Sequence, residues 1–260
     1  MRKWFVAGIG ILALAAGART AAAADLPGVA PAYRPAQTMV LFSWSGFYVG
    51  AHVGGGWGHK DEAGVPFTFA GNAIVLQPVS LDVRGGLAGG QLGFNYQTGI
   101  WVFGAEAQAS WSNLKGDAPC PFTATAGVLN ADCNAKVDAL GTFALRLGIA
   151  LDRVLLYGKG GGAWTNDKYS STPANTVLPF IFNANETRWG WMAGAGIEFA
   201  FTDNWSAKIE YNYMDLGKRS IRFVDSADTV FYLVDIRQVV NVVKFGVNYR
   251  FGVSSVAVRY

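Results

Sequence analysis

The most constraining feature of the sequence is a pair of alternating segments joined by a tight turn, residues 189–214. Apolar side chains take every second position from Trp191 to Phe199 and again from Ala207 to Tyr213. This two-residue period is the pattern of a β-strand with unlike faces. The intervening Thr202-Asp203-Asn204 favours a turn. The stretch therefore predicts a β-hairpin with one apolar face, which must meet either a protein core or lipid.

The same alternation recurs along the chain and predicts eight strands. In the clearest row, residues 101–111, aromatic side chains lie at both ends of the apolar face. Aromatic residues that bracket an apolar row are typical of the two interfaces of a membrane. We expect the interface aromatics to be Trp101, Trp111, Trp164, Trp189 and Trp205. The predicted strands cover approximately residues 44–57, 85–96, 101–111, 142–149, 154–164, 190–199, 206–213 and 242–251.

The connections between these strands alternate between short and long. Short turns are predicted after the second, fourth and sixth strands, and long loops after the others, at about residues 58–83, 112–138, 165–188 and 217–237. An even strand count with every short turn at one rim is typical of a transmembrane barrel whose termini lie in the periplasm. The predicted fold is all-β, an eight-stranded antiparallel transmembrane up-and-down β-barrel with four long surface loops and short periplasmic turns.

Hydrophobicity favours lipid as the surroundings of the apolar faces. The mean hydropathy is +0.22, yet no run of about 18 apolar residues follows the first 24 residues. A membrane barrel needs apolar side chains only at every second position. Its sheet must also close, because each unpaired backbone group in hydrocarbon costs several kcal/mol. A soluble lipocalin-like barrel is the main alternative.

The N-terminal segment predicts export. Arg2 and Lys3 precede an apolar run that is shorter than the roughly 20 residues of a membrane-spanning helix, and alanines at 21–24 follow it. These 24 residues also carry the whole formal excess charge of +3, so a nucleic-acid partner, which needs a clustered basic surface, has no support. We expect a signal peptide (1–24), a flexible Pro-rich periplasmic lead-in (25–43), the barrel (44–251) and a C-terminal extension (252–260), located in the cell outer membrane.

Several motifs resemble a known family. They are the opening Trp44-Ser45-Gly46-Phe47-Tyr48-Val49-Gly50, the hairpin 190–198 with its turn 201–206, Glu210-Tyr211, and Gly246-Val247-Asn248-Tyr249-Arg250-Phe251. Together they resemble the small alphaproteobacterial outer-membrane proteins of the OmpA-like barrel superfamily, also called the porin family or outer-membrane immunogenic proteins. The resemblance implies a surface antigen, a weak pore or a hemin binder. It also implies that the barrel assembly machinery reads a C-terminal aromatic residue, either Phe251 or Tyr260.

The polar faces of the strands predict the contents of the barrel. An eight-stranded barrel is only wide enough for its own side chains, and buried charges are normally paired. The arrangement is therefore either a salt-bridged plug or a narrow, gated pore. The charged side chains expected in the lumen are Glu106, Arg146, Lys159, Glu198, Lys208, Glu210, Lys244 and Arg250.

The two cysteines and two histidines allow little chemistry. Cys120 and Cys133 lie in the predicted second loop of an exported chain and predict a disulfide; their spacing does not indicate a metal site, and none is expected. His52 falls on the polar face of the first strand, whereas His59 at the start of the first loop is a possible hemin ligand. The glycine pairs do not form a phosphate-binding loop, because no helix follows them.

Taken together, these features predict an integral outer-membrane barrel with a structural or surface-antigen role and at most a narrow pore. Binding or transport of hemin or another small solute is the alternative, and an outer-membrane enzyme is the third. We expect no enzymatic activity and no cofactor. The expected partners are outer-membrane lipid, the barrel assembly machinery and host or surface ligands of the loops. We expect the protein to be a monomer.

Overall fold

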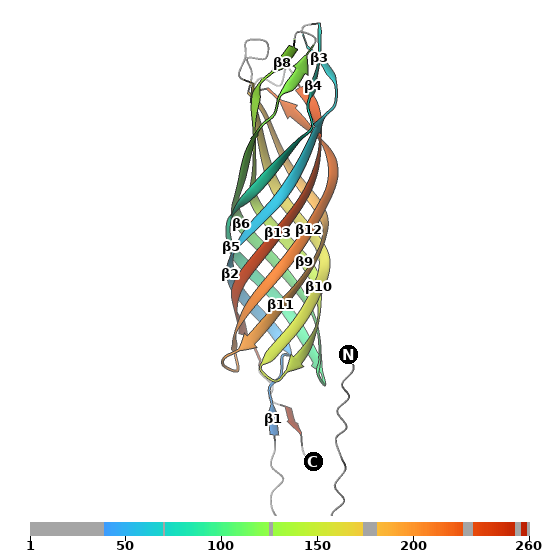
Figure 1. Ribbon diagram of the computed structural model, residues 1–260. Coiled ribbons are helices and arrows are strands. Elements are labelled where there is room, and N and C mark those ends of the chain that lie inside the picture. Colours follow the sequence, from blue (N-terminus) through green and yellow to red (C-terminus); the bar gives the residue numbers. More distant parts are fainter. Residues whose placement is uncertain are drawn as a thin grey trace, which may run out of the picture. The chain divides into compact units, whose positions relative to one another are not determined.

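The computed structural model describes residues 39–69, 71–124, 127–173, 181–225, 231–252 and 256–258. Eight long antiparallel strands form a closed barrel, in which β13 pairs with β2 to complete the ring (Figure 1). The strands are β2 (Gly46–Gly64), β5 (Val79–Thr98), β6 (Trp101–Pro119), β9 (Ala131–Leu151), β10 (Val154–Pro173), β11 (Phe182–Ala200), β12 (Trp205–Val224) and β13 (Phe231–Arg250). The all-β, eight-stranded prediction is confirmed. Among the residues described here, no helix is long and apolar enough to cross a membrane.

Three short turns join β5 to β6, β9 to β10 and β11 to β12. Gly99 and Asp152 lie in the first two turns with φ of 58° and 52°. Positive φ is the backbone conformation of tight hairpin turns, and glycine and aspartate are among the residues that adopt it at least cost. The predicted turn positions therefore match the observed ones. The predicted signal peptide, residues 25–38 of the lead-in and Tyr260 lie outside the described residues.

The predicted outer ends of the strands are wrong, because every strand continues well past its predicted limit. For example, β2 extends to Gly64 rather than Trp57, and β10 extends to Pro173 rather than Trp164. The four long loops are correspondingly shorter. Parts of the first two fold into a small sheet of β3 (Phe67–Phe69), β4 (Asn72–Leu76), β7 (Phe122–Ala124) and β8 (Gly127–Leu129), at the end of the barrel opposite β1 (Figure 1).

The strand β12 shows why the extensions were hard to recognise. Up to Tyr213 its outward side chains are apolar and its inward ones polar, as predicted. Beyond that point the inward side chains are apolar, including Leu216 and Phe223, and the outward ones are charged or polar. Leu216 and Gly217 also form a β-bulge, because the partner of Asp215 is Val239 and that of Lys218 is Arg237. A bulge shifts the alternation by one residue.

The reversal of polarity occurs around the whole barrel and divides it into two parts. We call the part from the short turns to the level of Trp57, Trp111, Trp164 and Trp191 the membrane half, because apolar side chains cover its outer wall. The part beyond these tryptophans is the surface half. Its interior is a hydrophobic core that includes Leu81, Leu114, Val137, Phe182, Ile221, Tyr232 and Val240. Its outer wall is mainly polar, with Asp82, Asn113, Lys115, Asn134, Lys168, Asn185, Arg219 and Arg222 exposed.

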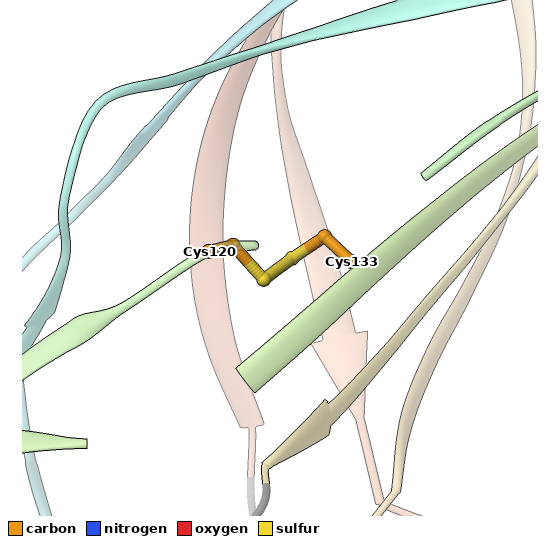
Figure 2. Close-up of a disulfide and its surroundings, with 2 residues drawn as sticks. All are labelled: Cys120 and Cys133. Carbon is orange, nitrogen blue, oxygen red and sulfur yellow. A yellow bond between two sulfur atoms is a disulfide. The ribbon is translucent and has the colours of Figure 1, made fainter. Parts of the chain in front are cut away.

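A disulfide joins Cys120 and Cys133 in this core, with a Cα–Cα distance of 5.7 Å (Figure 2). Cys120 follows β6, whereas Cys133 belongs to β9 and not to a loop, which corrects its predicted placement. Both side chains are buried. The disulfide therefore links the end of β6 to β9. The segment between these two strands contains β7 and β8.

The other end of the barrel is closed by residues that precede β2. Trp44 is 1% exposed; its backbone N–H donates to Gln97 Oε1 at 2.7 Å and its Nε1 donates to the Asp152 carbonyl at 3.0 Å. The ring of Phe42 packs edge-on against it. The prediction of a flexible lead-in up to residue 43 is therefore wrong at its end. Further out, β1 (Met39–Leu41) pairs with β14 (Val256–Val258), which lies in the predicted C-terminal extension.

Candidate functional site

The lumen of the membrane half contains a ring of two carboxylates and two ammonium groups. Lys159 Nζ lies 3.1 Å from Glu106 and 2.7 Å from Glu210, and Lys208 Nζ lies 2.7 Å and 3.4 Å from the same two carboxylates. These four side chains come from β6, β10 and β12 and are buried. Each charge faces two opposite charges, the arrangement that ionised groups need to remain stable away from water. The four residues, which we call the lumen quartet, occupy the axis of the barrel.

Arg146 from β9 connects the lumen quartet to the end of the barrel that bears the short turns. Its guanidinium lies 2.8 Å from Glu198 and donates to the Tyr48 hydroxyl at 2.6 Å. That hydroxyl in turn donates to Glu106 at 2.9 Å. The ring of Tyr157 stacks on the guanidinium, 3.8 Å from its centroid, which adds a cation–π contact in a site without bulk water.

The remaining two predicted lumen cations have no carboxylate partner among the described residues. Lys244 Nζ donates to Gln108 Oε1 at 2.6 Å. Arg250 Nη2 donates to the Asp203 carbonyl at 2.8 Å, and its guanidinium lies over the rings of Phe42 and Trp44. The eight predicted lumen residues therefore all lie inside the barrel, where six of them form ion pairs and two are held by neutral groups.

His52 also lies in the lumen, beside Ser110. Its Nε2 is 2.7 Å from the Ser110 hydroxyl, and its Nδ1 is 2.5 Å from Gln91 Oε1. A serine nucleophile requires a histidine base that a carboxylate usually orients, and an opening to substrate. Here an amide occupies the place of the carboxylate, and all three side chains are buried. His52, Ser110 and Gln91 therefore form a buried hydrogen-bonded group within the packed lumen.

A second polar cluster, which was not predicted from the sequence, interrupts the hydrophobic core of the surface half. Lys60 Nζ donates to Asp167 at 2.7 Å and to the Tyr169 hydroxyl at 3.0 Å. Gln238 donates to Asp167 at 3.1 Å, and Arg188 donates to Gln238 at 3.3 Å. We call these five residues the upper cluster. Lys60 has an even residue number, as do the inward-facing Tyr48 and His52, so the alternation of β2 could have placed it inside the barrel. It was missed because the predicted strand ended at Trp57.

Arg188 also satisfies the backbone at the β12 bulge. Its Nη2 donates to the Gly217 carbonyl at 2.7 Å and to the Ile236 carbonyl at 2.8 Å. Glu62 lies near the upper cluster and is 3% exposed. Burial raises the pKa of Glu62 to about 7, although the nearby ammonium of Lys60 opposes this shift. The surface half thus holds a carboxyl group that takes up a proton near neutral pH.

The other predicted site residues lie on the outer wall. His59 is in β2 and not in a loop, and its Nδ1 contacts the Asp82 carboxylate. The interface aromatics fall into two groups, with Trp101 and Trp205 near the short turns and Trp111, Trp164 and Trp189 at the junction with the surface half. Phe251 directly follows β13, and its backbone N–H donates to the Phe47 carbonyl at 2.8 Å.

The chain is similar to several outer-membrane proteins. A 31 kDa outer-membrane immunogenic protein of Brucella melitensis is 32% identical over 90% of this chain and 95% of its own length. A 22 kDa outer membrane protein of Rhizobium leguminosarum is 27% identical over 66% of this chain and 64% of its own length. The solved structure of OprG from Pseudomonas aeruginosa covers 79% of this chain and 97% of its own, with 14% identity and a TM-score of 0.43.

The family model for the outer membrane protein beta-barrel domain matches residues 10–251, which include all eight strands of the ring. The family match, the closed ring and the apolar outer wall of the membrane half all indicate that this is an integral protein of the outer membrane. The chain therefore belongs to the outer membrane protein beta-barrel domain family.

Proposed function

We propose that this protein is a structural barrel of the outer membrane that displays its surface half and loops as a surface antigen, with at most a narrow pore. The lumen quartet is the observation that carries the proposal. It places Glu106, Lys159, Lys208 and Glu210 across the axis with contacts of 2.7–3.4 Å. An ion that passed this point would have to separate buried charge pairs, which is costly in a low-dielectric interior.

Packed side chains at both ends of the barrel also support a closed lumen. Trp44 and Phe42 pack into the end near the short turns, and the apolar core with the upper cluster fills the surface half. A conducting path would therefore have to cross three layers of different chemistry. The surface half in turn offers a rigid support on which loops can be held in fixed positions.

Planar-bilayer recording of the purified barrel tests this proposal. The native protein should give no large, steady conductance. The double variant Lys159→Ala/Glu210→Ala removes one cation and one anion, so that the net charge stays the same while the quartet is lost. It should show more frequent openings than the native protein. Large, steady currents through the native barrel would contradict the proposal.

Binding of hemin is a second candidate, and one observation favours it. His59 is exposed, and its Nδ1 contacts Asp82, which leaves Nε2 available. Carboxylates commonly orient histidines that act as metal ligands in this way. Titration of the folded protein with hemin should then show a Soret shift that His59→Ala abolishes and Asp82→Asn weakens. Equal binding by His59→Ala and the native protein would exclude this site.

The proposal includes no catalytic activity, because the Ser110–His52 contact is buried and lacks a carboxylate. The proposed partners are outer-membrane lipid and the barrel assembly machinery, which would read Phe251 at the end of β13. Deletion of residues 252–260 should then leave assembly intact, whereas Phe251→Ala should slow it. Assembly lost by the deletion and kept by Phe251→Ala would assign the signal to Tyr260 instead.

A further inference from the structure

Four cationic side chains lie side by side on the outer wall of the surface half. In the strand register Arg84 of β5 is opposite Lys115 of β6, Lys115 is opposite Lys136 of β9, and Lys136 is opposite Lys168 of β10. Neighbouring strands are about 4.8 Å apart, and like charges directly opposite one another are destabilising. We call these residues the cation row. Such a row is unfavourable unless anions accompany it.

Within the described residues, the protein neutralises this row only in part. Asp138, the extra residue of a bulge in β9, contacts both Lys136 and Lys168. Hydrogen bonds from these two lysines hold the pKa of Asp138 below its usual range, so that it stays ionised. Arg84 and Lys115 form no ion pair with any described residue. The cation row therefore carries more positive than negative charge.

The opposite wall of the barrel is built differently. Lys218 and Arg237 are neighbours on β12 and β13, but Asp235 lies 2.9 Å from Lys218 and Asp215 lies 3.7 Å from Arg237. Arg219 likewise has Glu186 within 3.5 Å. Each of these three cations has its own carboxylate. The unpaired charge of the cation row is a local feature of strands β5 to β10.

A polar depression and an apolar groove lie along the same strands. The depression, of about 540 Å³, is lined by Lys115, Lys136 and Lys168, and also by Asp117. Closer to the short turns, a groove of about 430 Å³ runs over Ala107 and Ala109 between Trp111 and Trp164. It continues into a second groove of about 570 Å³. The two grooves share three residues, Leu92, Ala107 and Phe143.

The spacing of these features matches a lipid that stands in the outer leaflet. Lys115 is four residues beyond Trp111 on β6, and Lys168 is four beyond Trp164 on β10, or about 13 Å along each strand. Interfacial tryptophans mark the level of the headgroups. The grooves therefore lie at the depth of acyl chains, and the cation row lies where the anionic groups of a large headgroup would be.

A second copy of this chain fits the surface poorly. A symmetric dimer places the same patch on both subunits, so two cation rows would face each other. A lipid instead brings the missing negative charge together with chains that fill the grooves. We propose that an outer-leaflet glycolipid with phosphate groups docks on the outer wall of β5, β6, β9 and β10, with acyl chains in the apolar grooves and phosphates on the cation row.

Native mass spectrometry of the full chain, folded in detergent and titrated with lipid A, tests the proposal. The variant Arg84→Gln/Lys115→Gln should weaken binding about 30-fold, equivalent to roughly 1 kcal/mol for each lost cation. The matched control Lys218→Gln/Arg219→Gln, on the opposite wall, should change binding less than about threefold. Dephosphorylated lipid A should bind the native protein about as weakly as lipid A binds the first variant.

The acyl part of the proposal has its own test. Ala107→Trp should fill the groove floor and weaken binding of lipid A, whereas Ala195→Trp on β11 should not. Heat-modifiable gel migration establishes that each variant has folded; if Ala107→Trp does not fold, Ala105→Leu replaces it. Equal losses from both double cation variants would overturn the proposal. So would displacement of lipid A by millimolar inorganic phosphate without any effect of the groove variant, which would indicate an adventitious anion site only.

Discussion

The membrane half and the surface half use the same eight strands with opposite chemistry. In β12, Lys208 and Glu210 point inward below the ring of tryptophans, whereas Leu216 and Phe223 point inward above it. The pairing with β13 continues through both halves, interrupted by one bulge. Which face of a strand is apolar therefore depends on what surrounds it. Lipid draws apolar side chains outward, and water drives them inward.

The two halves are consequently stabilised by different forces. The surface half buries a hydrophobic core away from water, as a soluble barrel does. The membrane half gains little from the contact of apolar side chains with lipid, and depends on closed backbone hydrogen bonding and on paired charges in the lumen. Substitutions of the same type should therefore have different effects in the two halves.

The largest effect is expected in the lumen quartet. Glu106→Gln leaves Lys159 and Lys208 with one carboxylate between them, and the loss of one partner from a buried ion pair costs about 3 to 5 kcal/mol. Glu186→Gln, which removes the half-buried partner of Arg219 in the surface half, should cost less than about 1 kcal/mol. Urea unfolding in detergent micelles measures both values. Equal, small losses would mean that water solvates the lumen.

A slightly smaller effect is expected in the core of the surface half. Phe182→Ala removes a fully buried ring and should cost about 3 to 4 kcal/mol. Phe199→Ala, on the same strand but facing lipid, should cost clearly less, because lipid refills the vacated space. Limited proteolysis should find the surface half opened in the first variant and the membrane half still protected. Equal protease resistance of both variants and the native protein would argue against a hydrophobic core.

The same substitution at two outward positions of β11 compares the outer walls of the membrane half and the surface half. Ala195→Arg places a charge against lipid and should cost about 2 to 4 kcal/mol. Asn183→Arg, also outward but in the surface half, should stay within about 0.5 kcal/mol of the native protein. The unfolding free energies of the two variants give the comparison. If both are tolerated, the apolar wall does not face lipid at Ala195.

The smallest effect concerns pH and Glu62. Its folded pKa of about 7 lies above the ordinary value of 4.5, so the folded protein keeps a proton that the unfolded chain releases. Stability should therefore fall by about 1 to 3 kcal/mol as the pH rises from about 4.5 to 7, and level off above that. The ammonium of Lys60 lies near Glu62 and limits this rise of the pKa. Glu62→Gln should remove most of this slope, and an unchanged slope would assign it to another group.

The alternation of side chains was enough to predict the membrane half. Rows such as Trp101–Trp111 and Trp191–Phe199 identified the strands and their faces, and all eight predicted lumen charges point inward. The pairing within the lumen was not predictable, because one strand does not reveal which strand lies across the barrel. Lys159 and Glu106 meet although they are far apart in the sequence.

The surface half escaped prediction for two physical reasons. In β2 and β10 the segments His59–Glu62 and Thr165–Lys168 carry polar side chains on both faces, because the upper cluster is polar and so is the outer wall. In β9 and β12 a bulge shifts the alternation, at Asp138 and at Leu216–Gly217. Polar residues without a regular period are typical of loops, so these strands resembled loops.

Spin labels along the outward face of β12 test the reversal of polarity most directly. Nitroxides at Ala207, Ile209 and Tyr211 should be reached by oxygen dissolved in lipid, and those at Lys218, Ser220 and Arg222 by a water-soluble nickel chelate. The change should occur between Tyr213 and Lys218, and a label at inward-facing Ile221 should be shielded from both reagents. Oxygen access that continues to Arg222, or free access of the nickel chelate to Ile221, would contradict the division of this barrel into two halves of opposite polarity.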